Sequence, residues 1–416
     1  MPGVKTLRVL VVAPQPFYQE RGTPIATRLL LEALQAAGHA VDVLTYHVGR
    51  DPKLPGVRVF RAPAVPFVRD VPIGFSLRKV LCDLALLWRL FTLTRRRRYD
   101  VLHAVEEAVF LSLLVRAFAA GRANLGNTLH RFRCRVVYDM DSSLPEQLLG
   151  KYGALRFVDG VMRRFERLAI ARSDLVLAVC DDLAKRARGY ATRTPVDVVE
   201  DVSLLGDGCV DGEVENLRRG LPYGGLLVLY VGNLERYQGV DLMLDALARL
   251  EGPPLKFVAV GGGPDDVATY RARAAALDLD LEVDFIGARP LSQLGALLKQ
   301  ADVLVSPRLT GQNTPMKLYS YLAAGKAVLA TRIRAHTQVL SDDDALLVEP
   351  TAAGVARGLD ALLRSPMLRE RLALSALRLA TTRYSVTQFR ASIANAYRRL
   401  SVPAYGSYFS NHEVQR

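Results

Sequence analysis

Short apolar runs rich in β-branched residues alternate with helical patterns from one end of this chain to the other. Such alternation is typical of parallel sheets whose two faces are covered by helices. The strands expected in the first half are Arg8–Ala13, Ala40–Thr45, Val57–Arg61, Val101–His103, Arg135–Asp139, Leu175–Ala178 and Val196–Glu200. Those expected in the second half are Leu226–Val231, Lys256–Val260, Leu281–Ile286, Val303–Val305, Ala327–Ala330 and Leu346–Val348. The sequence therefore predicts an α/β protein.

The length of 416 residues exceeds what one hydrophobic core usually supports, so we expect two domains. A stretch dense in glycine and polar residues, 206–225, is typical of a linker between them. We predict an N-terminal domain at 1–205, a C-terminal domain at 226–383, and a helix and tail at 384–416 that cross back to the first domain. Both domains are expected to be Rossmann-like and doubly wound, with ligands held between them.

Positive charge is concentrated in the first half of the chain, which has a net charge of +13 overall. Residues 1–205 contain 31 Lys and Arg against 20 Asp and Glu, a net +11, whereas residues 206–416 contain 24 against 22, a net +2. A basic domain suits an anionic partner such as membrane phospholipid or nucleic acid, or is simply a solvated surface. The basic half has no recognisable nucleic-acid-binding module, so we expect no nucleic acid partner.

The cysteines and the apolar segments bear on localisation. Four widely spaced cysteines without a CxxC pair fit neither a zinc site nor a disulfide framework, which favours a reducing compartment. No secretory signal is visible near the start, and the longest apolar segment, Val80–Thr94, is too short to span a bilayer. We therefore expect a cytoplasmic protein.

A helix predicted over residues 75–98 is amphipathic and ends in a basic run, Arg95–Arg98. Its apolar stripe consists of Leu77, Val80, Leu81, Leu84, Leu87, Trp88 and Phe91. An apolar stripe next to a basic run suits peripheral docking on an anionic membrane, here the inner face. The alternative is a helix that turns this stripe to the core and places cations at its C-terminus, where the helix dipole favours them.

Two glycine-containing turns follow expected strands of the second half. Gly262 and Gly263 belong to a Gly-Gly-Gly-Pro turn between a strand and a helix, where free backbone N–H groups can bind phosphate. Gly232 and Asn233 form a second candidate of the same kind. The alternative for the first turn is a tight strand-to-helix connection without a ligand.

The most specific motif is the segment 306–331, SPRLTGQNTPMKLYSYLAAGKAVLAT. It resembles the donor-binding segment of family 4 ("group 1") glycosyltransferases, which are retaining enzymes of the GT-B fold. In that family a loop leads into a helix that ends in small residues, Gly and Lys, followed by a strand. The resemblance implies that the helix start, assisted by Lys317 as a catalytic cation, holds a sugar diphosphate.

Other segments resemble the family in the same order along the chain. Tyr18 and the run Arg21, Gly22 and Thr23 are similar to the first loop, which faces the donor phosphate and the acceptor. His103 ends a segment similar to Asp-Val-Val-His, which implies contact with the donor sugar or the acceptor; the alternative is a packed, hydrogen-bonded histidine at a strand end. The resemblance also implies that 1–205 is the acceptor-side domain and 226–383 the nucleotide-sugar-binding domain. Ile286 lies where the backbone often meets the nucleotide base.

The chain departs from the family at four positions. Two glutamates separated by seven residues are replaced by Gln312 and Ser320, and an Arg and a Lys that contact the diphosphate are replaced by Asn233 and Gln238. Losing two such cations removes several kcal/mol, at roughly 2–4 kcal/mol per preorganised contact. We expect Arg308 and Lys317 to compensate, in a variant donor loop that also contains Asn313 and Thr314.

Asp141 and Ser142, which follow another expected strand, are predicted to hydrogen-bond the acceptor; the alternative is helix N-capping by Ser142 or Ser143. Asp139 and Asp141 form an Asp-x-Asp pair that lacks a third metal ligand. We therefore expect no metal ion and no cofactor.

These residues together predict a retaining hexosyltransferase. It would move a hexose from a nucleotide sugar to a hydroxyl of a lipid-linked or glycan acceptor at a membrane. The lost cations and carboxylates leave an alternative, a non-catalytic GT-B scaffold or nucleotide-sugar-binding protein of a polysaccharide pathway. A sugar-nucleotide epimerase on the same fold is a third interpretation.

Overall fold

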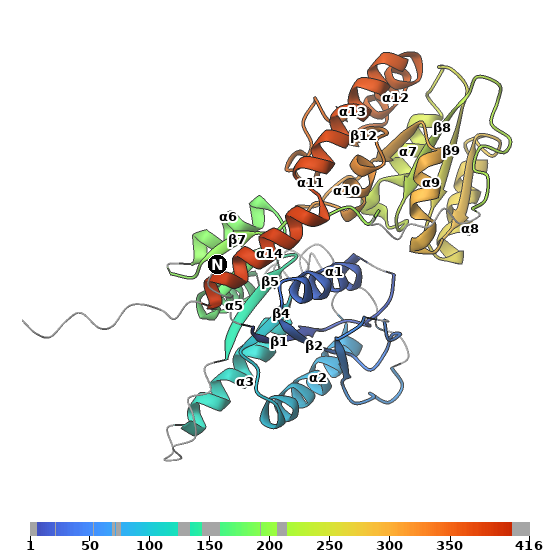
Figure 1. Ribbon diagram of the computed structural model, residues 1–416. Coiled ribbons are helices and arrows are strands. Elements are labelled where there is room, and N and C mark those ends of the chain that lie inside the picture. The colour runs from blue at the N-terminus through green and yellow to red at the C-terminus, as the bar shows by residue number, and fades with distance from the viewer. Residues whose placement is uncertain are drawn as a thin grey trace, which may run out of the picture.

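The computed structural model shows two α/β domains, each built on its own parallel sheet (Figure 1). It describes residues 6–20, 22–52, 54–68, 71, 76–123, 134–143, 159–191, 193–205 and 214–401. Two Rossmann-like domains were the fold predicted from the alternating pattern, and this fold class is confirmed. Among the predicted residues, Arg21 and part of the linker, 206–213, lie outside the described residues.

The first sheet has seven parallel strands in the order β3-β2-β1-β4-β5-β6-β7. They are β1 (Arg8–Ala13), β2 (Ala40–Thr45), β3 (Arg58–Arg61), β4 (Val101–Val105), β5 (Arg135–Met140), β6 (Leu175–Ala178) and β7 (Val196–Val198). Successive side chains point to opposite faces, so Val9 and Val11 join one core and Leu10 and Val12 the other. The central strands read as continuous apolar runs because both faces are covered.

Helices from different parts of the chain cover the two faces of this sheet. On one face lie α2 (Leu77–Arg96), α3 (Ala108–Ala123), α5 (Asp159–Arg172) and α6 (Asp181–Tyr190). The other face is covered by α1 (Gly22–Ala36) and by the last helix of the chain, α14 (Val386–Ser401). Helix α14 lies beside α1, as Figure 1 shows, and buries Ile393, Ala396 and Tyr397. The chain therefore returns to the first domain after completing the second.

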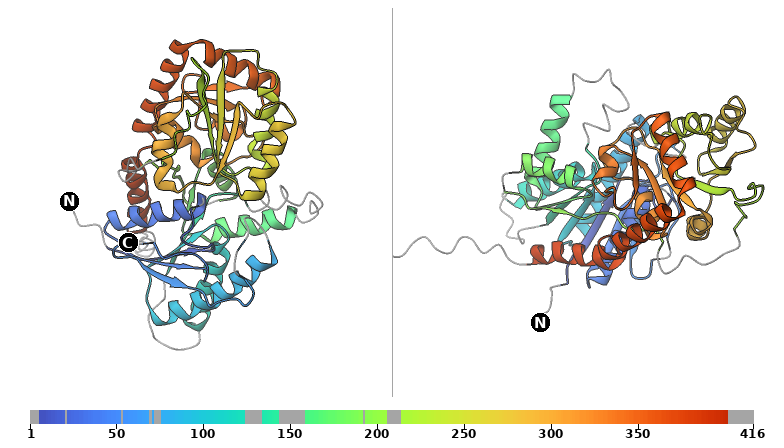
Figure 2. Two further views of the ribbon diagram at one scale, coloured as in Figure 1. Left: turned by 90° about the vertical axis from the view of Figure 1, so that its right-hand side faces the viewer. Right: turned by 90° about the horizontal axis from the view of Figure 1, so that it is seen from above.

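The second sheet has six parallel strands in the order β10-β9-β8-β11-β12-β13. They are β8 (Leu226–Val231), β9 (Leu255–Val260), β10 (Val283–Gly287), β11 (Val303–Ser306), β12 (Ala327–Thr331) and β13 (Leu346–Val348). One face packs on α7 (Val240–Leu247), α8 (Pro264–Ala275) and α12 (Ala352–Arg364), and the other on α9 (Leu294–Gln300), α10 (Met316–Ala323) and α13 (Pro366–Thr382). Short helices are η2 (Arg236–Gln238), η3 (Leu291–Gln293) and α11 (Arg334–Thr337). Figure 2 shows the sheet between its two helical layers.

Several strand boundaries differ from the predicted ones. Strand β4 continues beyond His103 to Val105, and β10 begins at Val283 rather than Leu281. Strand β7 ends at Val198, before the predicted end at Glu200. Each difference lies at an end of a strand, where sequence patterning is weakest because one residue more or less changes little burial.

Helix α2 turns only part of its predicted apolar stripe to the core. Its buried residues are Cys82, Leu86, Leu90, Leu93 and Thr94. Of the stripe, Leu87 and Phe91 pack partly buried against the core, whereas Leu77, Leu81, Leu84 and Trp88 are exposed, Trp88 at 58%. The core-facing alternative therefore holds for one edge of the stripe and is wrong for these four residues. No helix among the described residues is both long enough and apolar enough to cross a membrane.

Candidate functional site

The predicted site residues follow the carboxyl ends of strands in both sheets, which is where open α/β sheets bind ligands. On the second domain, Gly232 and Asn233 follow β8 and Arg308 follows β11. On the first domain, Tyr18 follows β1, and Asp141 follows β5. The domains meet at this level, since a Cβ added at Gly22 would lie 3.7 Å from Sδ of Met316 in α10, and the Leu291 N–H donates to Oε2 of Glu20 at 2.7 Å.

Lys317, in the first turn of α10, brings three of the predicted donor-side residues together. Its Nζ donates to Oε1 of Gln238 at 3.0 Å and lies 3.9 Å from the centroid of the Tyr230 ring. A Cβ added at Gly232 would approach Nζ to 2.8 Å. Burial, and then the charge of Arg308, hold the pKa of Lys317 well below its usual value. The ammonium is thus enclosed beside the loop that follows β8.

Arg308 organises the loop that precedes α10. Its Nε donates to the Thr310 carbonyl at 2.7 Å, and its Nη1 and Nη2 reach the carbonyl and Oδ1 of Asn313 at 3.2 and 3.3 Å. The loop passes close to the guanidinium at Gly311 (φ 137°), where a Cβ would lie 2.4 Å from Nη2. Arg308 is 8% exposed, and burial lowers its pKa. Within the described residues, no carboxylate pairs with Arg308 or with Lys317.

The two residues at the family's glutamate positions form contacts outside their own domain. Oε1 of Gln312 accepts from Nη2 of Arg186, on α6 of the first domain, at 3.3 Å. Ser320 is 1% exposed, and its Oγ accepts from the Leu204 N–H at 3.0 Å. Thr314, predicted to bind the donor, is also buried. The donor-binding role of all three stays a prediction.

The turn of Gly262 and Gly263 already contains a negative group. The Gly263 N–H, at the start of α8, donates to Oδ2 of Asp266 at 2.9 Å. Asp265 adds a second carboxylate to the same first turn, and a Cβ at Gly262 would lie 2.5 Å from the Leu234 side chain. These carboxylates repel phosphate at the helix N-terminus, so the contacts favour the alternative of a tight turn.

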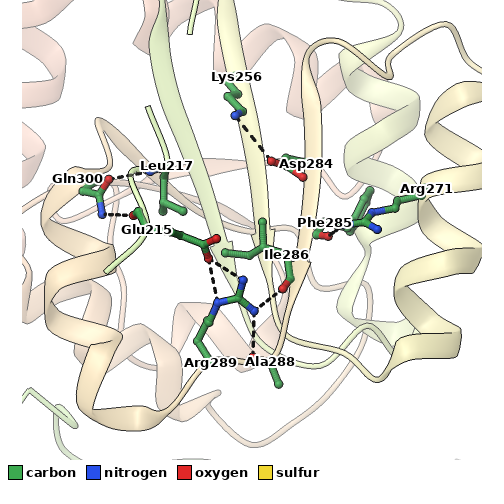
Figure 3. Close-up of polar contacts among 10 residues, drawn as sticks. All are labelled: Glu215, Leu217, Lys256, Arg271, Asp284, Phe285, Ile286, Ala288, Arg289 and Gln300. Carbon is green, nitrogen blue, oxygen red and sulfur yellow. Dashed lines mark hydrogen bonds and ion pairs between the residues drawn. The ribbon is translucent and has the colours of Figure 1, made fainter. Parts of the chain in front are cut away.

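Arginines fix the backbone around Ile286 (Figure 3). The Ile286 carbonyl accepts from Nη1 of Arg289, whose Nε donates to Oε1 of Glu215 at 2.8 Å. The preceding carbonyl, of Phe285, accepts from Nη2 of Arg271 at 2.6 Å. This segment is therefore held in place by side chains from α8 and from the start of the second domain, and its contact with a nucleotide base stays a prediction.

On the first domain, His103 lies inside β4 and is 0% exposed. Its Nε2 is 3.1 Å from Oδ2 of Asp139 on β5, and its Nδ1 is 2.7 Å from the hydroxyl of Tyr397 on α14. Both ring nitrogens therefore have protein partners. Contact of this imidazole with donor or acceptor stays a prediction.

Carboxyl groups gather beyond the ends of β4 and β5. The Ser142 hydroxyl donates to Oε1 of Glu106 at 2.9 Å, and the Glu106 N–H donates to the Asp139 carbonyl at 2.9 Å. Burial, followed by the charge of Asp139, raises the pKa of Asp141 and raises that of Asp201 to about 7. Part of this cluster is thus protonated near neutral pH and can donate as well as accept hydrogen bonds. Within the described residues, no group of three or more His, Cys, Asp or Glu is placed to hold a metal ion.

The start of the first domain places the remaining acceptor-side residues. Gly22 and Thr23 open α1. The Tyr18 ring lies under the guanidinium of Arg28, 5.7 Å from its centroid, and burial raises the pKa of its hydroxyl.

Comparison with known proteins identifies the family. The model described as "Glycosyl transferase 4-like domain" matches residues 21–200, and the model described as "Glycosyl transferases group 1" matches residues 216–377. The chain belongs to the group 1 glycosyltransferases. The resemblance seen in the sequence is thereby confirmed.

Curated relatives and solved structures agree with this assignment. The glycosyltransferase is 29% identical to a phosphatidyl-myo-inositol mannosyltransferase of Mycolicibacterium smegmatis, over 87% of this chain and 86% of that one. It is 27% identical to the enzyme of the same name from Mycobacterium tuberculosis, over 94% of this chain and 96% of that one. Its fold matches a sucrose-phosphate synthase from Thermosynechococcus elongatus with a TM-score of 0.74, at 20% identity over 95% and 99% of the two chains. Its fold also matches HepE from Anabaena, solved in complex with UDP, with a TM-score of 0.69. The identity is 16%, and the match covers 94% of this chain and 100% of that one.

The structure of the glycosyltransferase adds residues that the sequence did not single out. Tyr397 joins His103 across 294 residues of sequence. On α6, Asp182 pairs with Arg334, and its N–H donates to Oε1 of Gln338 at 3.1 Å. The Arg334 guanidinium lowers the pKa of the Asp182 carboxyl. These contacts connect distant segments, and no local pattern marks them.

Proposed function

We propose that this glycosyltransferase transfers mannose, with retention of configuration, from a nucleotide sugar to an inositol hydroxyl of a phosphatidylinositol-type lipid at a membrane surface. The enzyme class follows from the family. The sugar and the lipid follow from similarity to the mannosyltransferases of Mycolicibacterium smegmatis and Mycobacterium tuberculosis. Retention follows from the resemblance of segment 306–331 to retaining enzymes.

The observation that carries the proposal is the buried positive pair Lys317 and Arg308. A buried cation without an anionic partner is costly. The ammonium of Lys317 has Gln238 and the Tyr230 ring as its neighbours, and Arg308 is bound by neutral groups of its own loop. A diphosphate placed at the start of α10 would supply the missing negative charge and would face the positive end of the helix dipole.

The chemistry needs no metal ion and no protein base. The bond between the sugar C1 and the diphosphate oxygen breaks, and a new bond forms from the acceptor oxygen to C1 on the same face. The acceptor proton passes to the departing phosphate oxygen. Lys317, Arg308 and the first amides of α10 stabilise the charge that develops on the leaving group. Activity should therefore survive EDTA.

A donor panel tests the reaction. Purified protein is incubated with nucleotide hexoses of different bases and with phosphatidylinositol vesicles, and the lipid product is measured by mass spectrometry. We expect a mannosylated lipid with one nucleotide, and a loss of turnover of about 100-fold in Lys317→Ala, the scale found when a preorganised charge-stabilising group is removed. Lys256→Ala is the matched control. The Lys256 side chain lies on β9, away from the predicted donor loops, and donates to the Arg219 carbonyl. Full turnover in Lys317→Ala would overturn the donor assignment.

The face made by α2, α3 and α5 supports docking on the membrane. Large apolar side chains are exposed on all three helices: Leu77, Leu81, Leu84, Trp88, Leu114, Phe118, Val161, Phe165 and Leu168. The helices are neighbours in the structure, and aromatic contacts connect Phe91 with Phe118 and Phe110 with Phe165. An exposed apolar face of this kind indicates an interaction surface.

Arginines at the C-terminal end of α2 match an anionic surface. Arg89, Arg96 and Arg97 line a pocket of about 500 Å³ with Phe60 and Leu93. The guanidinium of Arg97 lies 5.3 Å from the centroid of the Phe60 ring. Among the described residues, none of these three arginines pairs with a carboxylate. Apolar side chains beside unpaired arginines are the combination expected for binding anionic lipid.

Trp88 reports on docking directly because it is the only tryptophan of the chain. We expect its fluorescence to shift to the blue with phosphatidylinositol vesicles and to be quenched by brominated acyl chains. Phosphatidylcholine vesicles should give a smaller shift. The variant Leu84→Glu should weaken sedimentation with vesicles, whereas Leu374→Glu, an exposed leucine on α13 of the other domain, should not. Unchanged Trp88 emission with anionic vesicles would reject docking through this face.

A further inference from the structure

A continuous hydrogen-bonded chain runs from the C-terminal helix to the acceptor half of the site. Tyr397 on α14 contacts Nδ1 of His103 on β4 at 2.7 Å, and Nε2 of His103 contacts Oδ2 of Asp139 on β5 at 3.1 Å. Tyr397 and His103 are both fully buried, and their rings are parallel within 10°, with centroids 6.1 Å apart. Three elements that are distant in sequence therefore converge on one imidazole.

Hydrogen-bonding rules fix the direction of this chain. An ionised carboxylate only accepts, so Nε2 of His103 must carry the proton that faces Asp139. In the neutral imidazole Nδ1 is then an acceptor, and the Tyr397 hydroxyl donates to it. The carboxylate end therefore selects the tautomer, and the Tyr397 hydroxyl supplies the donor that the unprotonated Nδ1 needs. Without the hydroxyl, a buried Nδ1 would lose its partner.

Asp139 lies near the end of β5, two residues before Asp141, which is predicted to face the acceptor. Its side chain is 22% exposed, so it reaches the surface at the end of β5. Its carbonyl binds the Glu106 N–H, and Glu106 in turn binds Ser142. Its charge also acts on Asp141 and Asp201. The backbone of Asp139 therefore positions Glu106, and the charge of its carboxylate acts on two neighbouring carboxyl groups.

We propose that Tyr397 is a positioning residue of the transferase: its hydroxyl donates to Nδ1 and fixes the His103 ring, and His103 holds the Asp139 carboxylate in place for the acceptor. This role of Tyr397 rests on the proposed function, since it assumes that the acceptor binds beside Asp139. It gives α14 a role beyond packing, because the last helix of the chain completes the acceptor half of the site.

The test compares Tyr397→Phe with Tyr384→Phe. Both changes remove only a hydroxyl from a buried tyrosine near the C-terminal end, and the Tyr384 hydroxyl has no hydrogen-bond partner. We expect kcat/KM for the lipid acceptor to fall about tenfold in Tyr397→Phe, the loss typical of one hydrogen bond to a buried group. The KM for the donor and the Kd for the nucleotide should not change. Tyr384→Phe should behave as wild type.

NMR of the histidine ring ¹⁵N nuclei measures the effect of Tyr397 on His103 directly and does not depend on an activity assay. The chain has six histidines, and the signals of His103 are assigned by their loss in His103→Gln. We expect a protonated Nε2 and a hydrogen-bonded, unprotonated Nδ1 in the wild type, and in Tyr397→Phe a change in the chemical shift of Nδ1 as it loses its hydrogen bond while Nε2 stays protonated. Because Gln can still donate to Asp139, adding Tyr397→Phe to His103→Gln should cost little further activity. The comparison of His103→Gln with the double variant therefore shows whether Tyr397 acts through His103.

Each result has a distinct meaning. An unchanged Nδ1 chemical shift in Tyr397→Phe would overturn the proposal, as would equal acceptor kinetics in Tyr397→Phe and Tyr384→Phe. A changed Nδ1 shift with unaltered acceptor kinetics would overturn the link to the acceptor. Absence of transfer to every lipid tested would defeat the proposed function, and the nucleotide affinity and the His103 tautomer would remain measurable.

Discussion

The ammonium nitrogen of Lys317 lies 3.0 Å from Oε1 of Gln238, although 79 residues separate the two in sequence. Related transferases commonly place a lysine at the position of Gln238, in the loop after the first strand of the second domain. Here the cation comes from α10 instead and reaches the same loop. An ammonium therefore lies beside this loop, supplied by α10 rather than by the loop itself.

Exchanging the two side chains should rescue activity. Lys317→Met removes the ammonium and should lower turnover about 100-fold. Adding Gln238→Lys to this variant brings an ammonium back from the opposite side of the same contact, and we expect at least a tenth of the lost activity to return. Gln238→Lys alone places two cations within about 3 Å of each other and should weaken folding. Steady-state kinetics of the three variants check this; no rescue in the double variant would contradict a shared location.

Nucleotide binding should take up protons. Burial and Arg308 lower the pKa of Lys317 in the free protein, and a diphosphate beside the ammonium raises it again. Between these two pKa values, binding adds a proton, so affinity for a nucleoside diphosphate should fall as pH rises. Burial raises the pKa of the Tyr230 phenol well above its usual value, and burial lowers that of His336 to about 4, so both groups stay neutral near neutral pH.

Calorimetry in buffers of different ionisation enthalpy measures this uptake. A matched titration of Lys317→Met should show weaker binding without the buffer dependence. Proton uptake of the same size in the variant would assign the effect to another group.

Sequence patterning was sufficient for most elements and for the family, because strand alternation and the segment 306–331 are local signals; the donor-binding roles of the loop residues stay predictions. It was insufficient for three kinds of feature. The outward orientation of four residues of the α2 stripe depends on which of two apolar faces of the helix meets the sheet. The Asp266 carboxylate at Gly263 is decided by a rotamer. The Tyr397–His103 contact depends on the return of α14 to the first domain. The local sequence around a tyrosine in an amphipathic helix does not indicate which distant residue it contacts.

Restoring the family's glutamate at position 320 should not increase activity. Ser320 is almost completely buried and binds the Leu204 N–H at the junction of the domains. Ser320→Glu inserts a longer, charged side chain there, and we expect it to cost about 1–3 kcal/mol from overpacking alone. Ser320→Ala, which loses one hydrogen bond, should cost about 1 kcal/mol. Thermal unfolding should rank the proteins wild type, Ala, Glu; higher turnover in Ser320→Glu would show that the position keeps its ancestral role.

His336 should make the second domain sensitive to acid. It is fully buried; its Nδ1 donates to the Thr331 carbonyl at 2.7 Å, and its Nε2 lies 3.0 Å from the Ser306 hydroxyl. Burial lowers its pKa from 6.5 to about 4. The neutral ring is thus favoured in the folded state, and the unfolded chain binds a proton first as pH falls.

The stability that His336 contributes is therefore complete above pH 6.5 and is lost between pH 6.5 and about 4. The shift corresponds to about 3 kcal/mol at 1.36 kcal/mol per pH unit. We expect the melting temperature of the wild type to fall over this range and that of His336→Gln, which cannot take up the proton, to fall less. His39, whose pKa burial also lowers, belongs to the first domain, so His39→Gln separates the two contributions. If the melting temperatures of wild type and His336→Gln fell equally with pH, the loss of stability would not come from protonation of His336.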